Sequence, residues 1–319
     1  MKRCAVFSCL GLGDGLISLL LSNNLQLNGF TVTSFHPFLD ALQDWFPHLP
    51  IRRFPSLTDV EPSLQEFDHF FIIYEKSPWM QAILTHCEKH YPQQTTVLNP
   101  IATGNRDYPY WENGRFDGNR PFVDNLYVFC KDLLKLPILT KGNGIVIPDR
   151  LQPKRFDKRV IFHPTSSRPG KNWARVKFLE LGRMLIDEGY HPVFILTQEE
   201  RQGWDTGNMD APSFDTLSDL AAFISESGYM IGNDSGIGHL ASCLGLPTLT
   251  ICRSRQSARF WRPAWTAGEV ITPSVLIPNL KGLRLRDQHW KKWITVRQAL
   301  NRFHRLKRDE NEVTTCQLK

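Results

Sequence analysis

Apolar runs alternate with longer amphipathic segments along both halves of this chain. The apolar runs are continuous instead of alternating, as expected of parallel strands that helices cover on both faces. We expect strands at residues 3–9, 30–35, 69–75 and 95–99 in the first half, and at 159–164, 192–196, 229–232 and 248–251 in the second. Two such series predict an α/β protein with two Rossmann-like domains.

The domain boundary is expected within residues 136–159, which are rich in proline and glycine and lack a helical period. We therefore assign residues 1–150 to an N-terminal domain and residues 151–319 to a C-terminal domain. A long stretch without a regular pattern, residues 101–122, is interpreted as a binding loop. The last pattern, residues 290–307, predicts an amphipathic basic helix.

The composition is that of a globular protein, with 41% hydrophobic and 22% charged residues. No apolar run approaches the roughly 18 residues of a membrane span. Asp14 interrupts the apolar N-terminus, which favours a first strand over a signal peptide. The seven cysteines form no Cys-x-x-Cys pair and no metal-like spacing with histidine. We therefore expect a cytoplasmic protein without a metal site.

Positive charge is concentrated near the C-terminus. Residues 281–308 hold ten Lys or Arg and one acid, Asp287. Such a segment can be a solvated helix face, or it can attract an anionic membrane surface, an acidic substrate or a nucleic acid. No nucleic-acid-binding motif accompanies it. We expect loose contact with an anionic membrane surface and no nucleic-acid partner.

Polar clusters follow several predicted strands, where doubly wound sheets bind their ligands. The first is "GLGDG" (11–15), in which Asp14 lies near the start of a helix. This carboxylate would repel a pyrophosphate at the same turn, and no acid ends the next strand to hold a ribose, so a nicotinamide enzyme is disfavoured. Asp14 is either a helix cap or a catalytic carboxylate that flexible glycines present to a ligand.

Two further clusters lie in the second half. In "HPTSSRPGKNW" (163–173), small hydroxyls and Lys171 could hold phosphate oxygens. In "NDSGIGH" (233–239), consecutive backbone N–H groups begin a helix and favour an anion, although Asp234 or Ser235 could be a simple cap and His239 a satisfied helix residue. Two phosphate-binding turns in one half and a lone carboxylate in the other fit a diphosphate donor and a proton acceptor.

The chain resembles glycosyltransferase family 9, typified by the ADP-heptose:lipopolysaccharide heptosyltransferases. Residues 160–196 are similar to the family's unit of strand, phosphate loop, Lys-x-Trp and helix. Residues 214–251 are similar to its Leu-x-x-Leu-Ala helix, followed by Asn-Asp-Ser/Thr-Gly-x-x-His-x-Ala-x-x-Leu-Gly-x-Pro, which is a specific motif. These matches cover about a quarter of the chain, and the "GLGDG" turn adds a shorter one.

The resemblance implies two facing Rossmann-like domains of the GT-B type with a cleft between them. It implies an inverting transfer without a metal or other cofactor, in which a sugar, expected to be heptose, moves from ADP-heptose to a lipopolysaccharide-core-type glycolipid or an oligosaccharide. It places the protein in the cytoplasm, peripheral on the inner face of the bacterial inner membrane. The N-terminal domain would bind the acceptor and the C-terminal domain the nucleotide sugar.

The resemblance also assigns roles to particular residues. Asp14 matches the catalytic base, Lys171 the diphosphate-binding lysine, and Asp234 the acid near the transferred sugar. The other donor-binding residues would be Thr165 and Ser166 in the phosphate loop, and Ser235, Gly236, Ile237 and His239 in the helix turn. Gln198, after the strand at 192–196, is a candidate ribose contact, although polar residues at a helix start are often only solvated.

The chain departs from the family pattern in two places. The stretch before Gly11 carries no basic residue, and the strand at 248–251 runs into "RSRQSARFWRPAW", which has four arginines where relatives have a short Gly-Pro-type loop. These departures leave two alternatives open. One is a non-catalytic nucleotide-sugar-binding protein of the same fold, and the other is a different two-lobed sugar-nucleotide enzyme such as an epimerase.

Overall fold

The computed structural model describes residues 2–100, 116–279 and 284–317. By their contacts, the residues form two compact units, Met1–Pro148 and Asp149–Lys319. Most of the expected binding loop at 101–122 lies outside the described residues. Within the part of the chain that is described, no helix combines the length and apolar character needed to cross a bilayer.

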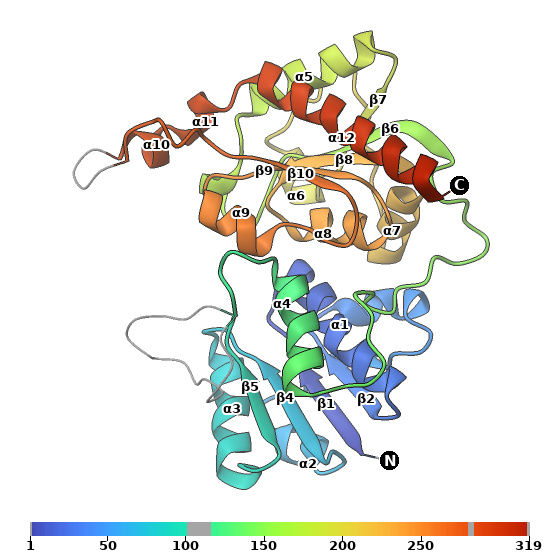
Figure 1. The fold of residues 1–319 in the computed structure, drawn as a ribbon, viewed down its shortest axis with the longest axis vertical. Coiled ribbons are helices and arrows are strands. Elements are labelled where there is room, and N and C mark those ends of the chain that lie inside the picture. The colour runs from blue at the N-terminus through green and yellow to red at the C-terminus, as the bar shows by residue number, and fades with distance from the viewer. Residues whose placement is uncertain (1, 101–115, 280–283, 318–319) are drawn as a thin grey trace. The chain divides into compact units, whose positions relative to one another are not determined.

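The N-terminal unit contains a five-stranded parallel sheet in the order β3-β2-β1-β4-β5 (Figure 1). Its strands are β1 (Arg3–Phe7), β2 (Thr31–Phe35), β3 (Ile51–Arg52), β4 (His69–Ile73) and β5 (Thr95–Leu98). Its helices are α1 (Leu12–Leu27), η1 (Leu39–Trp45), α2 (Val60–Leu64), α3 (Pro78–His90), α4 (Phe122–Val128) and η2 (Phe129–Leu133). Helices α2 and α3 pack against one face of the sheet, and α1 contacts β1, β2 and α4.

The C-terminal unit contains a second five-stranded parallel sheet, in the order β10-β9-β8-β6-β7. Its strands are β6 (Phe156–His163), β7 (His191–Phe194), β8 (Ser227–Asn233), β9 (Thr248–Ile251) and β10 (Gly268–Ile271). Its helices are η3 (Pro169–Lys171), α5 (Arg175–Asp187), α6 (Gln198–Arg201), α7 (Leu217–Ser225), α8 (Gly236–Cys243), α9 (Arg255–Trp261), α10 (Leu285–Gln288), α11 (Trp290–Trp293) and α12 (Val296–Gln317). The predicted fold class, two α/β domains with parallel sheets, is confirmed.

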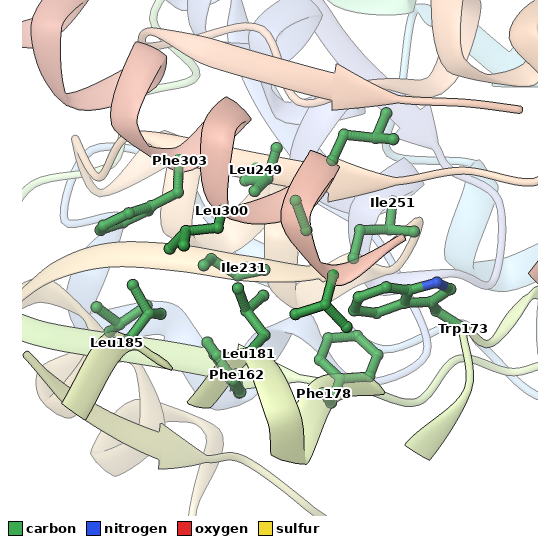
Figure 2. Close-up of a cluster of buried hydrophobic side chains, with 14 of the residues drawn as sticks. Phe162, Trp173, Phe178, Leu181, Leu185, Ile231, Leu249, Ile251, Leu300 and Phe303 are labelled. Carbon is green, nitrogen blue, oxygen red and sulfur yellow. The ribbon is translucent and has the colours of Figure 1, made fainter. Parts of the chain in front are cut away.

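One face of the C-terminal sheet is covered by α5 and α12 together. Figure 2 shows Leu300 and Phe303 of α12 over Ile231 of β8, with Leu181 of α5 in the same cluster. These side chains are buried, so α12 is part of the hydrophobic core and only its outer face carries solvated charge. Burial of this kind stabilises by about 25 cal/mol per Å² of apolar surface.

The structure corrects the sequence interpretation at three elements. Two strands were not predicted, β3 and β10, and each lies at one edge of its sheet. The single helix predicted for residues 290–307 is instead two helices, α11 and α12, because Ile294 is extended and Thr295 then caps α12. The Thr295 hydroxyl accepts from the Gln298 N–H (3.2 Å), while the Gln298 side chain accepts from the Thr295 N–H (2.8 Å).

Candidate active site

Two polar turns meet at the carboxyl ends of β6 and β8, which are neighbouring parallel strands. Asn233, the last residue of β8, joins them. Its side-chain carbonyl accepts from the Trp173 N–H (2.9 Å), and its amide donates to the Pro164 carbonyl oxygen. Both groups are buried, so these bonds fix the loop after β6 to the turn before α8.

Lys171 and Asp234 form an ion pair at the junction of these turns. Lys171 Nζ lies 2.9 Å from Asp234 Oδ2, and the lysine and aspartate side chains are 37% and 12% exposed. The Ser257 hydroxyl of α9 lies 3.4 Å from the same carboxylate oxygen. The sequence-predicted Lys171 and Asp234 are therefore brought together, 63 residues apart in the chain.

A buried histidine holds Ser235 in place. Ser235 Oγ lies 3.0 Å from His163 Nδ1, and Thr165 Oγ1 lies 3.4 Å from His163 Nε2. Because Thr165 also bonds to the Glu200 carboxylate, its hydroxyl proton goes to Glu200, and His163 Nε2 carries the proton of a neutral ring. Burial lowers the pKa of His163 to about 4, which keeps the ring neutral.

The first turn of α8 lacks a side-chain cap, because the Ser235 hydroxyl bonds to His163 instead. Ser235 is the N-cap residue, and Gly236 and Ile237 are partly exposed in the first turn. An uncapped helix N-terminus attracts anions through its backbone N–H groups and its dipole. This turn therefore has the geometry of an anion site, with the Lys171 ammonium group beside it.

The loop after β6, residues 164–174, which the sequence predicts to bind phosphate, is held in place by contacts with residues 290–294. The Trp290 indole donates to the Gly170 carbonyl (3.1 Å), and the Trp173 indole donates to the Ile294 carbonyl (3.1 Å). Lys177 Nζ also donates to the Ile294 carbonyl (2.7 Å). In the loop, Ser166 Oγ lies 2.6 Å from Asn172 Oδ1. The Thr165 side chain is buried, so only Ser166 of the two predicted hydroxyls is partly exposed.

A pocket of about 420 Å³ opens beside the ion pair. Its lining includes three cations, two carboxylates and two hydroxyls: Arg168, Lys171, Arg253, Asp234, Asp287, Ser254 and Ser257. This volume is within the range of small-molecule sites, and the excess of cations suits an anionic ligand.

Two predicted donor residues lie apart from this pocket. Gln198 is exposed at the start of α6, whose capping box is formed by Thr197 and Glu200. His239 is 4% exposed, with its ring edge-on to Trp265, and burial lowers its pKa to about 4. Its Nδ1 atom is buried without a hydrogen-bond partner among the described residues. The roles of Gln198 and His239 stay predictions.

In the N-terminal unit, Asp14 lies in the first turn of α1, directly after β1. A Cβ atom at residue 11 would lie 2.4 Å from Asp14 Oδ2, so a side chain there would push this carboxylate out of its position. His36, after β2, accepts two backbone N–H bonds at Nδ1, and its Nε2–H therefore donates to the Gly11 carbonyl (3.2 Å). Burial lowers the pKa of His36 to about 4, so a neutral ring holds the turn.

A second carboxylate, Glu75, also lies near this turn. Its Oε2 accepts from the Leu10 N–H (3.1 Å), and its Oε1 is buried without a hydrogen-bond partner in the described part of the chain. Burial raises the pKa of Cys9 well above its ordinary value, and the charges of Asp14 and Glu75 raise it further. The sequence interpretation missed His36, Glu75 and His163, although each lies at or just beyond the carboxyl end of a predicted strand.

No group of three or more His, Cys, Asp or Glu side chains within the described ranges could hold a metal ion. This observation does not test the expected absence of a metal cofactor, which stays a prediction.

Comparisons with known proteins identify the C-terminal unit. Residues 148–274 match the model of glycosyltransferase family 9 (heptosyltransferase). Lipopolysaccharide heptosyltransferase 1 of Campylobacter coli is 27% identical over 161 residues, which are 46% of this chain and 47% of that protein. The chain therefore matches about half the length of this curated relative.

Solved structures of low identity share the fold of the whole chain. A family 9 glycosyltransferase from Veillonella parvula is 17% identical with a TM-score of 0.68, over 96% of this chain and 97% of that one. The ADP-heptose lipopolysaccharide heptosyltransferase II of Escherichia coli is 16% identical with a TM-score of 0.67, over 98% and 100%. The resemblance seen in the motifs is confirmed over residues 148–274, which match glycosyltransferase family 9.

Proposed function

We propose that this chain is an inverting glycosyltransferase that transfers heptose from ADP-heptose to a glycolipid acceptor of the lipopolysaccharide-core type. The observation that carries the proposal is the Lys171–Asp234 ion pair beside the uncapped N-terminus of α8, in a family 9 domain. The solved E. coli relatives include a heptosyltransferase with ADP and one with ADP-2-deoxy-2-fluoro heptose. Those names concern the relatives and support the choice of donor.

The C-terminal site would act on the leaving group. As the bond between sugar and diphosphate breaks, negative charge grows on the diphosphate oxygens. Lys171 and the first N–H groups of α8 would stabilise that charge, and Arg168 and Arg253 add cations to the same pocket. Asp234 holds the lysine in place and lies where it can accept from a sugar hydroxyl. In this proposal no metal ion takes part.

The N-terminal site would activate the acceptor. Asp14 would take the proton from the acceptor hydroxyl as its oxygen attacks the anomeric carbon from the side opposite the diphosphate, which inverts the configuration. His36 would hold the turn that carries Asp14, since it bonds to the Gly11 carbonyl from the end of the next strand. The neutral His36 adds no charge that would weaken the base.

The acceptor implies where the protein works. A glycolipid of this class is anionic and lies in a membrane, so we include in the proposal a cytoplasmic protein that contacts the inner face of the inner membrane loosely. The exposed cations Lys292, Arg297 and Arg308 of the C-terminal segment support this contact.

The test is a transfer assay with ADP-heptose and a lipid A–core acceptor that lacks the added heptose. The expected result is acceptor-dependent release of ADP and a product of inverted anomeric configuration, in the presence of a chelator. The absence of both transfer and donor hydrolysis, despite tight ADP binding, would favour a non-catalytic binding protein. A 2-epimerised sugar nucleotide formed without acceptor would favour an epimerase.

A further inference from the structure

A second basic pocket lies along the edge strand β10, with residues of α9 and α12 in its lining. It measures about 610 Å³ and shares no lining residue with the pocket at Lys171. Four of the residues that line it are arginines, and none of the described lining residues is acidic. The transfer reaction proposed above uses none of these arginines.

The sequence of α9 explains how the arginines converge. Arg255 and Arg259 of α9 are spaced i and i+4, which places them on one side of the helix, and Arg262, the residue directly after the helix, lines the same pocket. Ala258, on the same side, is small and buried, and it leaves space between the longer side chains. The other side of α9, with Ser254 and Ser257, lines the pocket at Lys171. One short helix therefore separates two basic pockets.

The fourth arginine, Arg302, comes from α12 and is fixed by Glu269 of β10 (2.8 Å). The other oxygen of Glu269 lies 3.1 Å from Arg305 Nε. Two arginines therefore share this mostly buried carboxylate. The pocket is left with a net positive charge, which would attract an anion.

The chemistry of the lining selects the kind of anion. Guanidinium groups bind phosphate oxygens in a bidentate way, and several around one cavity suit a ligand with more than one phosphate charge. Val275, which lines the pocket, is 57% exposed, and the next residue in the chain, Leu276, is 89% exposed. An apolar rim next to an anion pocket suits a ligand whose phosphate lies at a lipid surface.

We propose that this pocket is a second anion site, distinct from the donor site, that binds a phosphate-bearing ligand. The phosphate can belong to a lipid headgroup or to a soluble diphosphate, since both present the same oxygens to the arginines.

The experiment uses the full chain and two probes. Binding of inorganic pyrophosphate is measured by calorimetry at low salt, in a Lys171→Ala background that weakens the donor site. Co-sedimentation is measured with phosphatidylcholine vesicles that contain or lack phosphatidic acid. The pocket variant is R259Q/R262Q, with R255Q/R262Q as a second variant in case the first disturbs folding. The matched control, K158Q/R183Q, removes the same charge from exposed positions of the same unit outside the pocket.

The expected result is that a pocket variant weakens pyrophosphate binding, or binding to phosphatidic acid vesicles, about tenfold or more, while the control stays close to the parent protein. Loss in the pyrophosphate arm identifies a soluble diphosphate, and loss in the vesicle arm alone identifies a lipid headgroup. Equal effects of pocket and control variants in both arms would overturn the proposal, since the arginines would then only contribute general charge. Binding of polyglutamate without binding of either phosphate probe would also overturn it and assign the pocket to an acidic protein.

Discussion

The position of the Lys171 ammonium group depends on a partner far away in the sequence. Its Nζ atom is held 2.9 Å from the Asp234 carboxylate, beside the first turn of α8. The amine therefore does not have to be ordered when a diphosphate binds, and less conformational entropy is lost.

We expect Lys171→Ala to weaken ADP binding by about 10- to 150-fold, the equivalent of a charge-assisted hydrogen bond of roughly 1.5–3 kcal/mol. Folding should change little, because the lysine is partly exposed. Calorimetric titration with ADP checks this, with Lys158→Ala as a control that removes an exposed lysine from the same unit. An unchanged dissociation constant would show that Lys171 does not bind the diphosphate.

We expect Asp14→Asn to keep ADP binding and to lose most of the transfer rate. Asparagine matches the size of aspartate and can still cap a helix, whereas general-base catalysis contributes about 10²- to 10⁴-fold. Single-turnover transfer with bound ADP-heptose measures the loss. Glu88→Gln, the same chemical change at an exposed site of α3, should behave like the parent protein. Turnover of Asp14→Asn near the parental rate would leave Asp14 with a capping role only.

The candidate site residues that could be predicted from the sequence lie in short polar turns directly after strands, as do Lys171, Asp234 and Ser235. The amino acids of such a turn are neighbours in the sequence, so their combination is visible without knowledge of the tertiary contacts. His163 could not be predicted, because a histidine that ends a buried strand is consistent with a core position. Its partner Ser235 is 72 residues away and is identified only when β6 and β8 are paired.

At the level of secondary-structure elements, α11 connects the loop between β6 and α5 (residues 164–174) to the core. We call this loop the donor loop, after its proposed role. Trp290 is buried, and its indole donates to the Gly170 carbonyl, one residue before Lys171. This bond therefore fixes the loop next to Lys171.

We expect Trp290→Phe to weaken ADP binding by about two- to tenfold, because it removes one neutral hydrogen bond, worth roughly 0.5–1.5 kcal/mol, and keeps most of the packing. Trp293→Phe is the matched control. It removes a bond of the same kind from the same helix, to the Leu285 carbonyl, which is not in the donor loop. Equal ADP affinities for the two variants would mean that α11 does not order the loop. Thermal unfolding of both variants separates this effect from a general loss of stability.

The predicted elements were those with long or strongly apolar patterns. The four strands expected in each half are observed, with ends that differ by up to three residues. Strands β3 and β10 escaped prediction because β3 has only two residues and β10 begins with an exposed glycine and a glutamate, so neither contains a continuous apolar run. The break at Ile294 escaped because the apolar positions continue at helical spacing across it, although Thr295 and Gln298 carry the capping-box pattern that begins α12.

At the level of the whole molecule, three buried histidines make stability depend on pH. Burial lowers the pKa of His36, His163 and His239 to about 4, from 6.5 in the unfolded chain. The unfolded state therefore binds protons first as the pH falls below 6.5. Their contribution to stability is complete above pH 6.5 and is lost progressively as the pH falls to about 4.

Near pH 5.5, each of these histidines should cost about 1.2 kcal/mol of unfolding free energy relative to neutral pH. Urea unfolding at the two pH values measures the difference. His163→Asn should reduce the loss by about one third of the combined effect, whereas His48→Asn, at an exposed site, should leave it unchanged. A pH slope that is the same in His163→Asn and in the parent protein would contradict the assignment of His163 as a neutral buried ring.

Surface charge gives a second prediction at this scale. Because the apolar face of α12 is buried, this helix would contact a membrane through its exposed cations, each worth about 1 kcal/mol near an anionic surface. We expect binding to anionic vesicles at low salt and its loss at about 0.5 M salt, where screening is severe. K292Q/R297Q/R308Q should bind more weakly than K158Q/R183Q. Equal binding to neutral vesicles, or none at low salt, would leave these charges only solvated.

The burial of α11 and α12 also bears on how the protein is made. A third of the buried side chains in the C-terminal core come from residues 290–306, and so does the indole that orders the donor loop. While the ribosome is still adding these residues, the sheet of the C-terminal unit is complete in sequence, but one apolar face is covered only in part, by α5. The N-terminal unit has its whole core by then, because its compact contacts end at Pro148. A message cut short before the codon for Trp290 would therefore direct the synthesis of a chain whose first half can fold, and whose second half is a substrate for chaperones and proteases.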